Sequence, residues 1–549
     1  MSTLALYWHT VRHLRPVQVY GRVWFRLRRP TPDLSPPPAR RPVVAPLIET
    51  AWREPSMLGP DTVAFLGRTA TVKRPEDWTA AGADHLWLYN LHYFDDLGAR
   101  DAPMRADWHR ALVARWIAEN PPGSRPGWEP YPTSLRLVNW IRWILAGNVP
   151  SDPMVQSIAV QARWLAQRLE THLLGNHLLA NAKALTLAGL FFDGDEARGW
   201  YRIGTDILAR ELDEQILADG GHFELSPMYH HIVLADVLDL LDVHACYAVE
   251  APPAWRAGVA RMLAWSAVMR HPDGDIPFFN DAAFGIAPTH AILAQRAAGL
   301  GIAWTDPGIG AVARLPESGY VRLRRGEATV FADLAPIGPD YLPAHAHADT
   351  LSFELSLRGR RVVVNGGTSR YGTGPERQRQ RSTAAHATLA LDGADSSEVW
   401  GGFRVGRRAR VSGVEVHEAA DALVATGCHD GYARLPGSPL HRRTWRLDAQ
   451  ALTLDDEVRG SGRHEARIVF PLGPGLAAQV ADARTVRVVD TTTGETIATF
   501  AFEHDGAALV EDTTWHPAFG QAVPSQRIVC RLPVDGTAAH RTTIAWGER

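Results

Sequence analysis

The chain has 549 residues, of which 46% are apolar and 21% are charged. This length is too great for one ordinary hydrophobic core, so two large domains are expected, and the apolar content excludes a disordered chain. The net charge of −3 gives the molecule as a whole no reason to bind a polyanion, so such binding would need local basic clusters.

Residues 1–45 are expected to form an N-terminal arm, with one short helix followed by the stretch PTPDLSPPPARRP. Between Arg12 and Arg41, eight arginines stand against one acid, Asp33. The arm could touch an anionic surface or serve as a solvated linker, and its prolines favour the linker. No secretory signal and no membrane span of about 18 apolar residues is visible, which indicates the cytoplasm by default and leaves the periplasm open.

Helical periodicity dominates residues 46–312, where apolar residues recur at three- and four-residue spacing. Helices joined by short turns form stacked antiparallel hairpins, as in an (α/α) toroid. The clearest helical segments are 154–192, 200–217, 231–249 and 255–270.

The pattern changes near Pro316, after which apolar and polar residues alternate. Alternation with Gly and Asp at the breaks predicts antiparallel strands, and their number indicates a β-sandwich over residues 313–549. The predicted fold class is therefore α+β, an N-terminal toroid followed by a C-terminal antiparallel sandwich. The clearest runs are 319–334, 351–367, 387–393, 444–460 and 464–472.

Two polar clusters interrupt the helical region. Asn176 and His177 lie within a helical pattern, where Asn is unfavourable. They either mark a kink that presents both side chains to a cavity or belong to a helix–helix turn with Asn176 as a cap. Ser226 is expected to cap the next helix, with a proline in the first position. Capping does not explain the polar residues around it, which are Glu224, Tyr229 and His230.

Histidines and arginines form the remaining candidates. His345 and His347 alternate, so on an extended segment both point the same way, which suits a metal ligand beside a catalytic base, although a surface pair is the simpler explanation. His386 and Asn365 strengthen the metal interpretation. The arginines of residues 370–410 could bind carboxylates or sulfates, or form a solvated face, and no motif for reading nucleic acid accompanies them.

Taken in order, these motifs resemble the heparinase II/III-like family of polysaccharide lyases. The resemblance implies an active site in the cleft between toroid and sandwich. It also implies that an acidic, uronate-containing polysaccharide, glycosaminoglycan-like, alginate-like or bacterial, is cleaved by β-elimination to leave a 4,5-unsaturated uronate end. The matching pieces are LWLYNLHYFDDL (86–97), WEPYPTSLRLVNWIRW (128–143), GNHLLAN, FELSPMYH, HAHADTLSFEL and AHATLALDG.

The resemblance also implies roles for individual residues. Asn176 and His177 would neutralise the uronate carboxylate, while Tyr229 and His345 would carry the proton transfers, with the roles of acid and base left open between them. A single zinc-like divalent metal is expected at His347, Asn365 and His386, weakly bound because Asn365 stands where Asp is common, and no organic cofactor is expected. The expected substrate-binding residues are Tyr89, Asn90, His92, Trp128, Glu129, Tyr131, Glu224, His230, Arg377 and Arg381.

Two other functions remain open at this point. A glycoside hydrolase on a helical toroid would need two facing carboxylic acids, and Glu129, Glu224 and Asp281 are candidates that form no convincing pair. A polysaccharide-binding factor without catalysis would not need Tyr229 or His345. The sequence predicts no oligomeric state.

Overall fold

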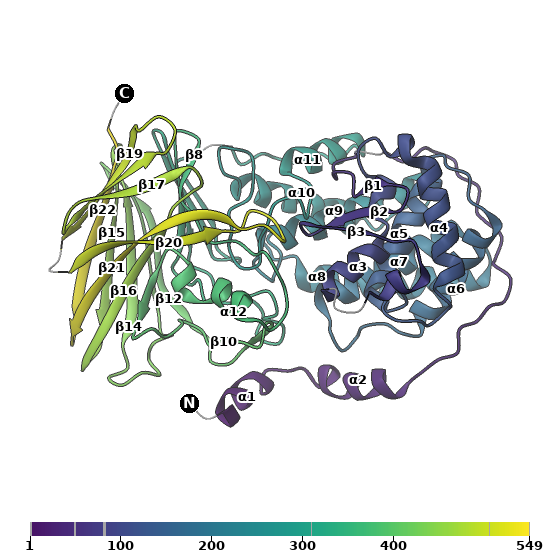
Figure 1. The fold of residues 1–549 in the computed structure, drawn as a ribbon, viewed down its shortest axis with the longest axis horizontal. Helices are drawn as coiled ribbons and strands as arrows, with labels where there is room; N and C mark the ends of the chain where they lie inside the picture. The colour runs from purple at the N-terminus through teal and green to yellow at the C-terminus, as the bar shows by residue number, and fades with distance from the viewer. Residues whose placement is uncertain (1–2, 49–50, 81–83, 309, 504–505, 548–549) are drawn as a thin grey trace.

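The computed structural model describes residues 3–48, 51–80, 84–308, 310–503 and 506–547. Helices occupy one end of the elongated molecule and sheets the other, in the order that the change of periodicity predicts (Figure 1). The α+β prediction is therefore confirmed, and the switch falls between the last long helix, which ends at Gly299, and the first strand of the sandwich, which begins at Val312.

The helical domain surrounds a core rich in tryptophan and leucine. Its central helix, α7, is apolar around most of its circumference, and nearly all of its residues are buried for that reason. Residues 154–192 form two helices and not one, because the chain turns at residues 167–174. The helices are α3 (His85–Tyr93), α4 (Ala106–Glu119), α5 (Pro130–Leu145), α6 (Asp152–Ala166), α7 (Gly175–Phe191), α8 (Asp195–Gln215), α9 (Pro227–Cys246), α10 (Pro253–Val268) and α11 (His290–Gly299).

A small antiparallel sheet that the periodicity did not predict precedes these helices. Its strands are β1 (Met57–Gly59), β2 (Thr62–Phe65) and β3 (Arg68–Thr71). The carboxylate of Asp96 fixes the sheet to the helical domain by accepting hydrogen bonds from the backbone N–H groups of Ser56 (2.6 Å) and Met57 (2.9 Å).

The sandwich domain is built from antiparallel strands that share one core. An eight-stranded sheet, ordered β12-β13-β14-β15-β22-β19-β18-β17, packs with a four-stranded sheet, β20-β21-β16-β9, and a five-stranded sheet, β4 to β8. The first strands are β4 (Val312–Leu315), β5 (Tyr320–Arg325), β6 (Ala328–Asp333), β7 (Phe353–Leu357), β8 (Arg360–Val363), β9 (Leu389–Leu391), β10 (Val399–Trp400) and β11 (Arg404–Val405), with the short helix α12 (Pro375–Arg381) among them. The later strands are β12 (Val411–Glu418), β13 (Leu423–His429), β14 (Leu440–Leu447), β15 (Ala451–Arg459), β16 (Arg463–Pro471), β17 (Leu476–Asp482), β18 (Thr485–Asp490), β19 (Thr496–Glu503), β20 (Ala507–Trp515), β21 (Val523–Asp535) and β22 (Ala538–Ala545).

The turn between β20 and β21 reaches the helical domain (Figure 1). The backbone N–H of Phe284 donates to the carbonyl of Pro517 (2.7 Å), and Gly520 lies directly against Leu66 and Gly67 of the β2–β3 turn. A Cβ at Gly520, where φ is +76°, would overlap the Leu66 carbonyl, so this contact requires glycine. The turn thus joins the two domains beside the cleft.

The N-terminal arm contains two helices, α1 (Thr3–Val11) and α2 (Pro16–Leu27), where one was expected. The solvated-linker interpretation of its proline-rich half is also wrong, because that half lies against the helical domain. Arg163 donates to the carbonyls of Ser35 (2.6 Å) and Pro36 (2.9 Å), and the Arg41 N–H donates to Phe191 (2.9 Å). Among the described helices, none is long and apolar enough to cross a membrane.

Candidate active site

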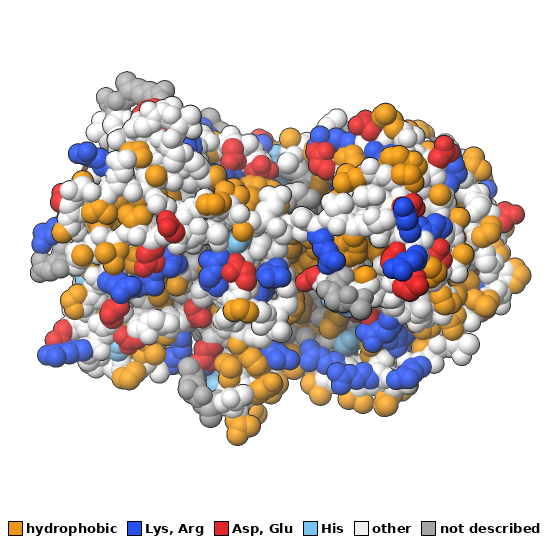
Figure 2. Space-filling view, in the orientation of Figure 1, with side chains coloured by type: hydrophobic (Ala, Val, Ile, Leu, Met, Phe, Trp, Pro, Cys, Tyr) orange, Lys and Arg blue, Asp and Glu red, His pale blue; other side chains and the backbone are white. Residues whose placement is uncertain are grey.

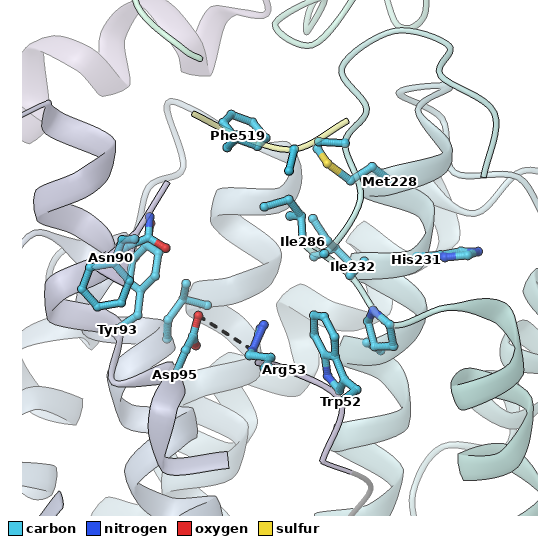
Figure 3. A pocket seen from close by; sticks show the side chains of 18 of the residues that line it. Trp52, Arg53, Asn90, Tyr93, Asp95, Met228, His231, Ile232, Ile286 and Phe519 are labelled. Carbon is cyan, nitrogen blue, oxygen red and sulfur yellow. Dashed lines mark ion pairs between the residues drawn. The ribbon is translucent and has the colours of Figure 1, made fainter. Parts of the chain in front are cut away.

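A cavity of about 990 Å³ lies between the two domains. Helices α3, α5, α7 and α9 supply one side, and the sandwich domain supplies His345, Tyr371 and the β20–β21 turn. Figure 3 shows Trp52 and Arg53 on one wall, with Arg53 paired to Asp95 at 3.8 Å, and Phe519 of the β20–β21 turn on another. Aromatic walls with a few charged groups suit a ligand made of sugar rings.

Tyr229 and His345 meet in this cavity although they come from different domains. Their rings stack with centroids 3.8 Å apart and an angle of 15°. As predicted, Ser226 caps α9, and its Oγ accepts from the Tyr229 N–H (3.2 Å), which fixes the tyrosine in the first turn. Burial, followed by the neighbouring Tyr371 and Asp281, raises the pKa of Tyr229 well above 10, so its hydroxyl is protonated at neutral pH.

Glu224 holds His345 from behind. His345 Nδ1 is hydrogen-bonded to Glu224 Oε2, and the side chains are 10% and 2% exposed. Burial raises the pKa of Glu224, but the imidazole of His345 and other histidines outweigh it, so the pKa is lowered and the carboxylate is ionised. An ionised partner selects the tautomer with a proton on Nδ1, which leaves Nε2 as a proton acceptor.

Tyr371 is a cleft residue that sequence reasoning missed. Its hydroxyl lies 2.8 Å from the hydroxyl of Tyr229, and its ring is stacked beyond His345, with centroids 6.2 Å apart. Burial raises its pKa well above 10. The only local signal was its place in the glycine-containing segment SRYGTG, which indicates a loop and no particular chemistry.

Asn176 and His177 line the same cavity at the start of α7. The chain does turn just before the pair, but Leu174 and not Asn176 is the N-cap of α7, and both side chains face a cavity, as the kink interpretation required. Leu174 has a φ of +64° and Gly175 a φ of +55°, and a Cβ on Gly175 would lie 2.4 Å from Leu342. This unusual backbone turn sets the direction of the two polar side chains.

Glu170 supports His177 and was also missed by the sequence. Its Oε1 lies 3.1 Å from His177 Nδ1, while Oε2 accepts from Asn181 Nδ2 (3.1 Å). Burial lowers the pKa of His177, but the carboxylate of Glu170 more than offsets burial, so the pKa is raised above 6.5. Tyr131 stacks on the imidazole with centroids 4.3 Å apart. The cationic form of His177 is therefore more populated here than in a free histidine.

A second group of charged residues also lines the cavity. Lys183 Nζ contacts Asp236 (2.6 Å) and Asp239 (2.5 Å), and Asp239 also pairs with Arg142 and Arg296. Burial lowers the pKa of Lys183 to about 8, with the two nearby arginines adding to the effect.

The three predicted metal residues come together but do not form a three-donor site. His347 Nδ1 faces His386 Nε2 at 3.2 Å, whereas the Asn365 Oδ1 atom lies 3.1 Å from the other ring nitrogen of His386, Nδ1. An ion held between the two imidazoles would have Asn365 on the far side of the His386 ring. Within the described residues, no cluster of three or more His, Cys, Asp or Glu could hold a metal ion. The arrangement therefore does not fit the expected metal.

His347 also departs from the expectation that it points the same way as His345. The segment between them is a loop and not a strand, so the two-residue alternation does not apply. His347 is fully buried, and its Nε2 contacts Asp281 Oδ1 at 2.9 Å.

Arg377 and Arg381 do not line the cleft, contrary to the prediction. Both side chains are buried in the protein interior, with 0% exposure. Arg377 forms a two-pronged ion pair with Asp281, and Arg381 Nε donates to the carbonyl of Ala346 (2.9 Å). Both lie on or at the end of α12, whose inner face packs into the sandwich domain. Their charge stabilises the protein interior and is not available to a polymer in the cleft.

The other predicted binding residues divide between cavity and interior. Tyr89, Asn90 and Tyr131 line the cavity. Glu129 and Glu224 lie behind it, the first accepting from the Tyr89 hydroxyl and the second supporting His345. His92, Trp128 and His230 are corrected to core positions: they are 0%, 3% and 0% exposed and bond to other residues of the toroid.

Comparisons with known proteins agree with this architecture. The chain is 28% identical to a heparin-sulfate lyase of Bacteroides stercoris over 40% of its length and 36% of the relative. It is 28% identical to FtsZ-localized protein C of Caulobacter vibrioides over 68% of its length and 62% of the relative. The chain thus spans about a third to three fifths of these curated relatives.

The fold is shared with solved lyase structures. The heparan sulfate lyase of Pedobacter heparinus superposes with a TM-score of 0.61 at 19% identity, covering 97% of this chain and 88% of the other. The heparinase II/III N-terminal domain matches residues 100–292, and the heparinase II/III-like C-terminal domain matches residues 309–546. Since both domains match in the family's order, the chain belongs to the heparinase II/III-like family.

Proposed function

We propose that the protein is a carbon–oxygen lyase that cleaves an acidic, uronate-containing polysaccharide by β-elimination. The observation that carries the proposal is the stacked pair of Tyr229 and His345 in a cavity that Asn176 and His177 also line. The names of the relatives suggest a heparan-sulfate-like polymer as the first substrate to test.

The proton transfers divide naturally between the stacked pair. The Nε2 atom of His345 accepts the C5 proton of the uronate, because Glu224 holds the other nitrogen protonated. The C4–O4 bond breaks as the C4–C5 double bond forms, and Tyr229 gives its proton to the departing O4. Burial raises the pKa of Tyr229 and so keeps its hydroxyl protonated, which means that a proton is present for the departing O4 and that no phenolate is present to act as the base.

Asn176 and His177 complete the chemistry by neutralising the uronate carboxylate. The C5 proton is weakly acidic until this carboxylate is neutralised and the developing enolate is stabilised. The Asn176 amide can donate a hydrogen bond, and the imidazolium favoured by Glu170 adds a positive charge. No step of the proposed reaction passes through a metal ion.

The three acids considered for the hydrolase alternative are not placed to act on a ligand in the cavity. Glu129, Glu224 and Asp281 do not line the cavity, and each is already held by a partner: Tyr89, His345 and Arg377. A binding factor without catalysis is the remaining alternative, because one relative is named for its localisation with FtsZ and not for an enzyme activity.

Ultraviolet absorbance tests the proposal, because β-elimination creates an absorbing C4–C5 double bond and hydrolysis does not. The substrates are heparan sulfate, chondroitin, hyaluronan and alginate, each incubated with wild type, Tyr229→Phe and His345→Ala. Tyr201→Phe is the matched control, since its hydroxyl contacts His244 within the toroid and outside the cavity. Absorbance that grows with wild type and the control, but not with the other two variants, is expected. New reducing ends without absorbance would establish a hydrolase, and tight binding without cleavage would establish a binding factor.

A further inference from the structure

Large apolar side chains are exposed in unusual number on the two helices of the N-terminal arm. Among the described residues, eighteen large hydrophobic side chains are exposed, and nine of them lie between Leu4 and Leu27. A soluble surface normally scatters such residues singly, so a concentration of this kind marks a contact surface. The nine are Leu4, Tyr7, Trp8, Val11, Val19, Tyr20, Val23, Trp24 and Leu27.

The exposed residues follow helical spacing and form a stripe on each helix. On α1 the stripe consists of Leu4, Tyr7, Trp8 and Val11, and on α2 of Tyr20, Val23, Trp24 and Leu27. Positions separated by three and four residues lie on one face of a helix. The α2 side chains of this stripe are 58% to 74% exposed, so nothing in the described chain covers them.

The opposite face of α2 holds the helix in place. Gln18 Nε2 donates to the carbonyl of Tyr341 (3.0 Å), Gly21 lies against His172, and Phe25 packs on the same histidine with ring centroids 4.4 Å apart. Helix α1 is anchored through Thr10, whose Oγ1 accepts from Trp400 Nε1 (3.1 Å). The two stripes are therefore displayed by helices already docked on the protein, along the lower edge of the molecule in Figures 1 and 2.

The arm also concentrates positive charge. Residues 3–29 contain six arginines and no acidic residue, in a chain whose net charge is −3. Arg22, Arg26, Arg28 and Arg29 are exposed, and none forms an ion pair in the described structure. Figure 2 shows blue and orange side chains side by side on this edge. Apolar stripes with aromatic residues, flanked by arginine, are the composition of helices that lie in the interface of an anionic membrane.

We propose that the α1–α2 arm binds the surface of a lipid bilayer that contains anionic lipid, with both helices lying in the plane of the interface. Helix α2, at 12 residues, is about 18 Å long and far shorter than the roughly 30 Å hydrocarbon core, so it lies on the membrane and does not cross it. Trp8, Trp24 and Leu27 insert among the acyl chains, and the arginines pair with lipid phosphates. This inference does not depend on the proposed enzymatic function.

Vesicle flotation of the full chain tests the proposal. Wild type should float with phosphatidylcholine vesicles that contain phosphatidylglycerol, and should bind pure phosphatidylcholine at least about tenfold more weakly. The double variant Trp24→Ser, Leu27→Ser should lose binding to both. The matched control is Met104→Ser, Val149→Ser, which removes two apolar side chains from the toroid surface that are even more exposed, at 85% and 81% against 61% and 74% for Trp24 and Leu27.

Three further measurements keep the test decisive. The thermal melt of the Trp24→Ser, Leu27→Ser variant should match wild type, because both side chains face solvent. Arg22→Gln with Arg26→Gln should weaken binding to the anionic vesicles roughly tenfold and leave binding to pure phosphatidylcholine unchanged. Light scattering reports self-association. Wild type that stays at the bottom of the gradient with anionic vesicles overturns the proposal, and a dimer that the serine variant dissociates would assign the stripes to a second copy of the chain.

Discussion

Two clusters of polar residues lie close together beside the cleft, and they differ in how many of their polar atoms have a hydrogen-bond or ion-pair partner within the protein. The cleft group consists of Tyr229, His345, Glu224 and Tyr371, and the buried network consists of Asp281, His347, His386 and Arg377. The two meet in the backbone, where the Asp281 N–H donates to the His345 carbonyl (2.9 Å). The His345 side chain is 10% exposed, while those of His347, Asp281 and Arg377 are 0% exposed.

This difference shows that neighbouring polar residues can have different roles, with the cleft group free to react with a ligand and the buried network holding the fold together. In the described structure His345 Nε2 has no protein partner, so it can accept a proton from a ligand. His347 has partners at both ring nitrogens, and Asp281 accepts from Arg377, His347 and Thr368. We expect changes in the first group to lower activity and changes in the second to lower stability.

The largest expected effects are catalytic. Tyr229→Phe and His345→Ala should each lower kcat by about a hundred- to ten-thousand-fold, since each removes one proton-transfer group. The melting temperature of Tyr229→Phe should stay near that of wild type, whereas His345→Ala leaves the buried carboxylate of Glu224 without its imidazole partner and should melt at a lower temperature. Initial rates from ultraviolet absorbance and a thermal melt of each variant check the two halves of the prediction. A variant with full activity would remove its residue from the proposed reaction.

The second effect concerns stability. Arg377→Met should destabilise the fold by about 3–5 kcal/mol, because it leaves the carboxylate of Asp281 buried without its main counter-charge. The control is Arg379→Met on the same helix, whose side chain is 41% exposed and whose loss should change stability by less than about 0.5 kcal/mol. Urea unfolding measures both. Equal effects of the two substitutions would contradict the division between cleft and network.

The fold could be predicted from the sequence because its signals are periodic. Spacing of three and four residues marked the helices, alternation marked the strands, and Ser226 with Pro227 marked the start of α9. The small sheet β1–β3 was missed because its strands have only three or four residues, too few for a period to be read.

The site could be predicted only in part, because residue type does not reveal burial. Arg377 occurs in an arginine-rich segment that resembles a polyanion-binding surface, yet its partner Asp281 lies 96 residues away in the chain. The alternation of His345 and His347 suggested a shared direction that only a strand would impose. Tyr371 and Glu170 gave no signal, since their roles depend on contacts with Tyr229 and His177 across turns of irregular structure.

A buried carboxylate that does not itself line the cleft, Asp96, extends the comparison to the β1–β3 sheet. Burial raises the pKa of Asp96, but hydrogen bonds from His109, Arg105 and two backbone N–H groups outweigh burial and lower the pKa to about 2. A lowered pKa contributes stability that is present above about pH 4 and is lost as the pH falls toward 2. The size of this shift corresponds to about 2 kcal/mol.

Asp96→Asn should therefore lower stability at neutral pH by about 2 kcal/mol and flatten the dependence of stability on pH between about 4 and 2. Urea unfolding at a series of pH values measures both quantities. Asp107→Asn is the control, because the side chain of Asp107 is 92% exposed and pairs only with the neighbouring Arg110. If the stability of Asp96→Asn still falls between about pH 4 and pH 2 as steeply as that of wild type, carboxylates other than Asp96 cause the loss of stability in acid.

The smallest expected effect lies within the cleft and depends on Glu170. If a cationic His177 neutralises the uronate carboxylate, activity should fall as the pH rises through the pKa of His177. Glu170→Gln removes the carboxylate that raises this pKa, so the alkaline limb of kcat/KM should move to lower pH, while Gln keeps the hydrogen bond to Asn181. Glu211→Gln is the control, because Glu211 is a buried toroid carboxylate whose described partner is Gln215.

Stability gives an independent reading of the same pair. Because the folded pKa of His177 is raised, the pair contributes stability that is fully present below about pH 6.5 and is lost as the pH rises through the folded pKa. Glu170→Gln should remove this pH-dependent contribution to the free energy of unfolding. The variant should therefore be less stable than wild type below about pH 6.5, and the two stabilities should converge as the pH rises above the folded pKa of His177. A shifted alkaline limb together with this convergence would assign both effects to the charge on His177. A uniform loss of activity at every pH, with no change in the limb, would instead give Glu170 a structural role in the turn before α7.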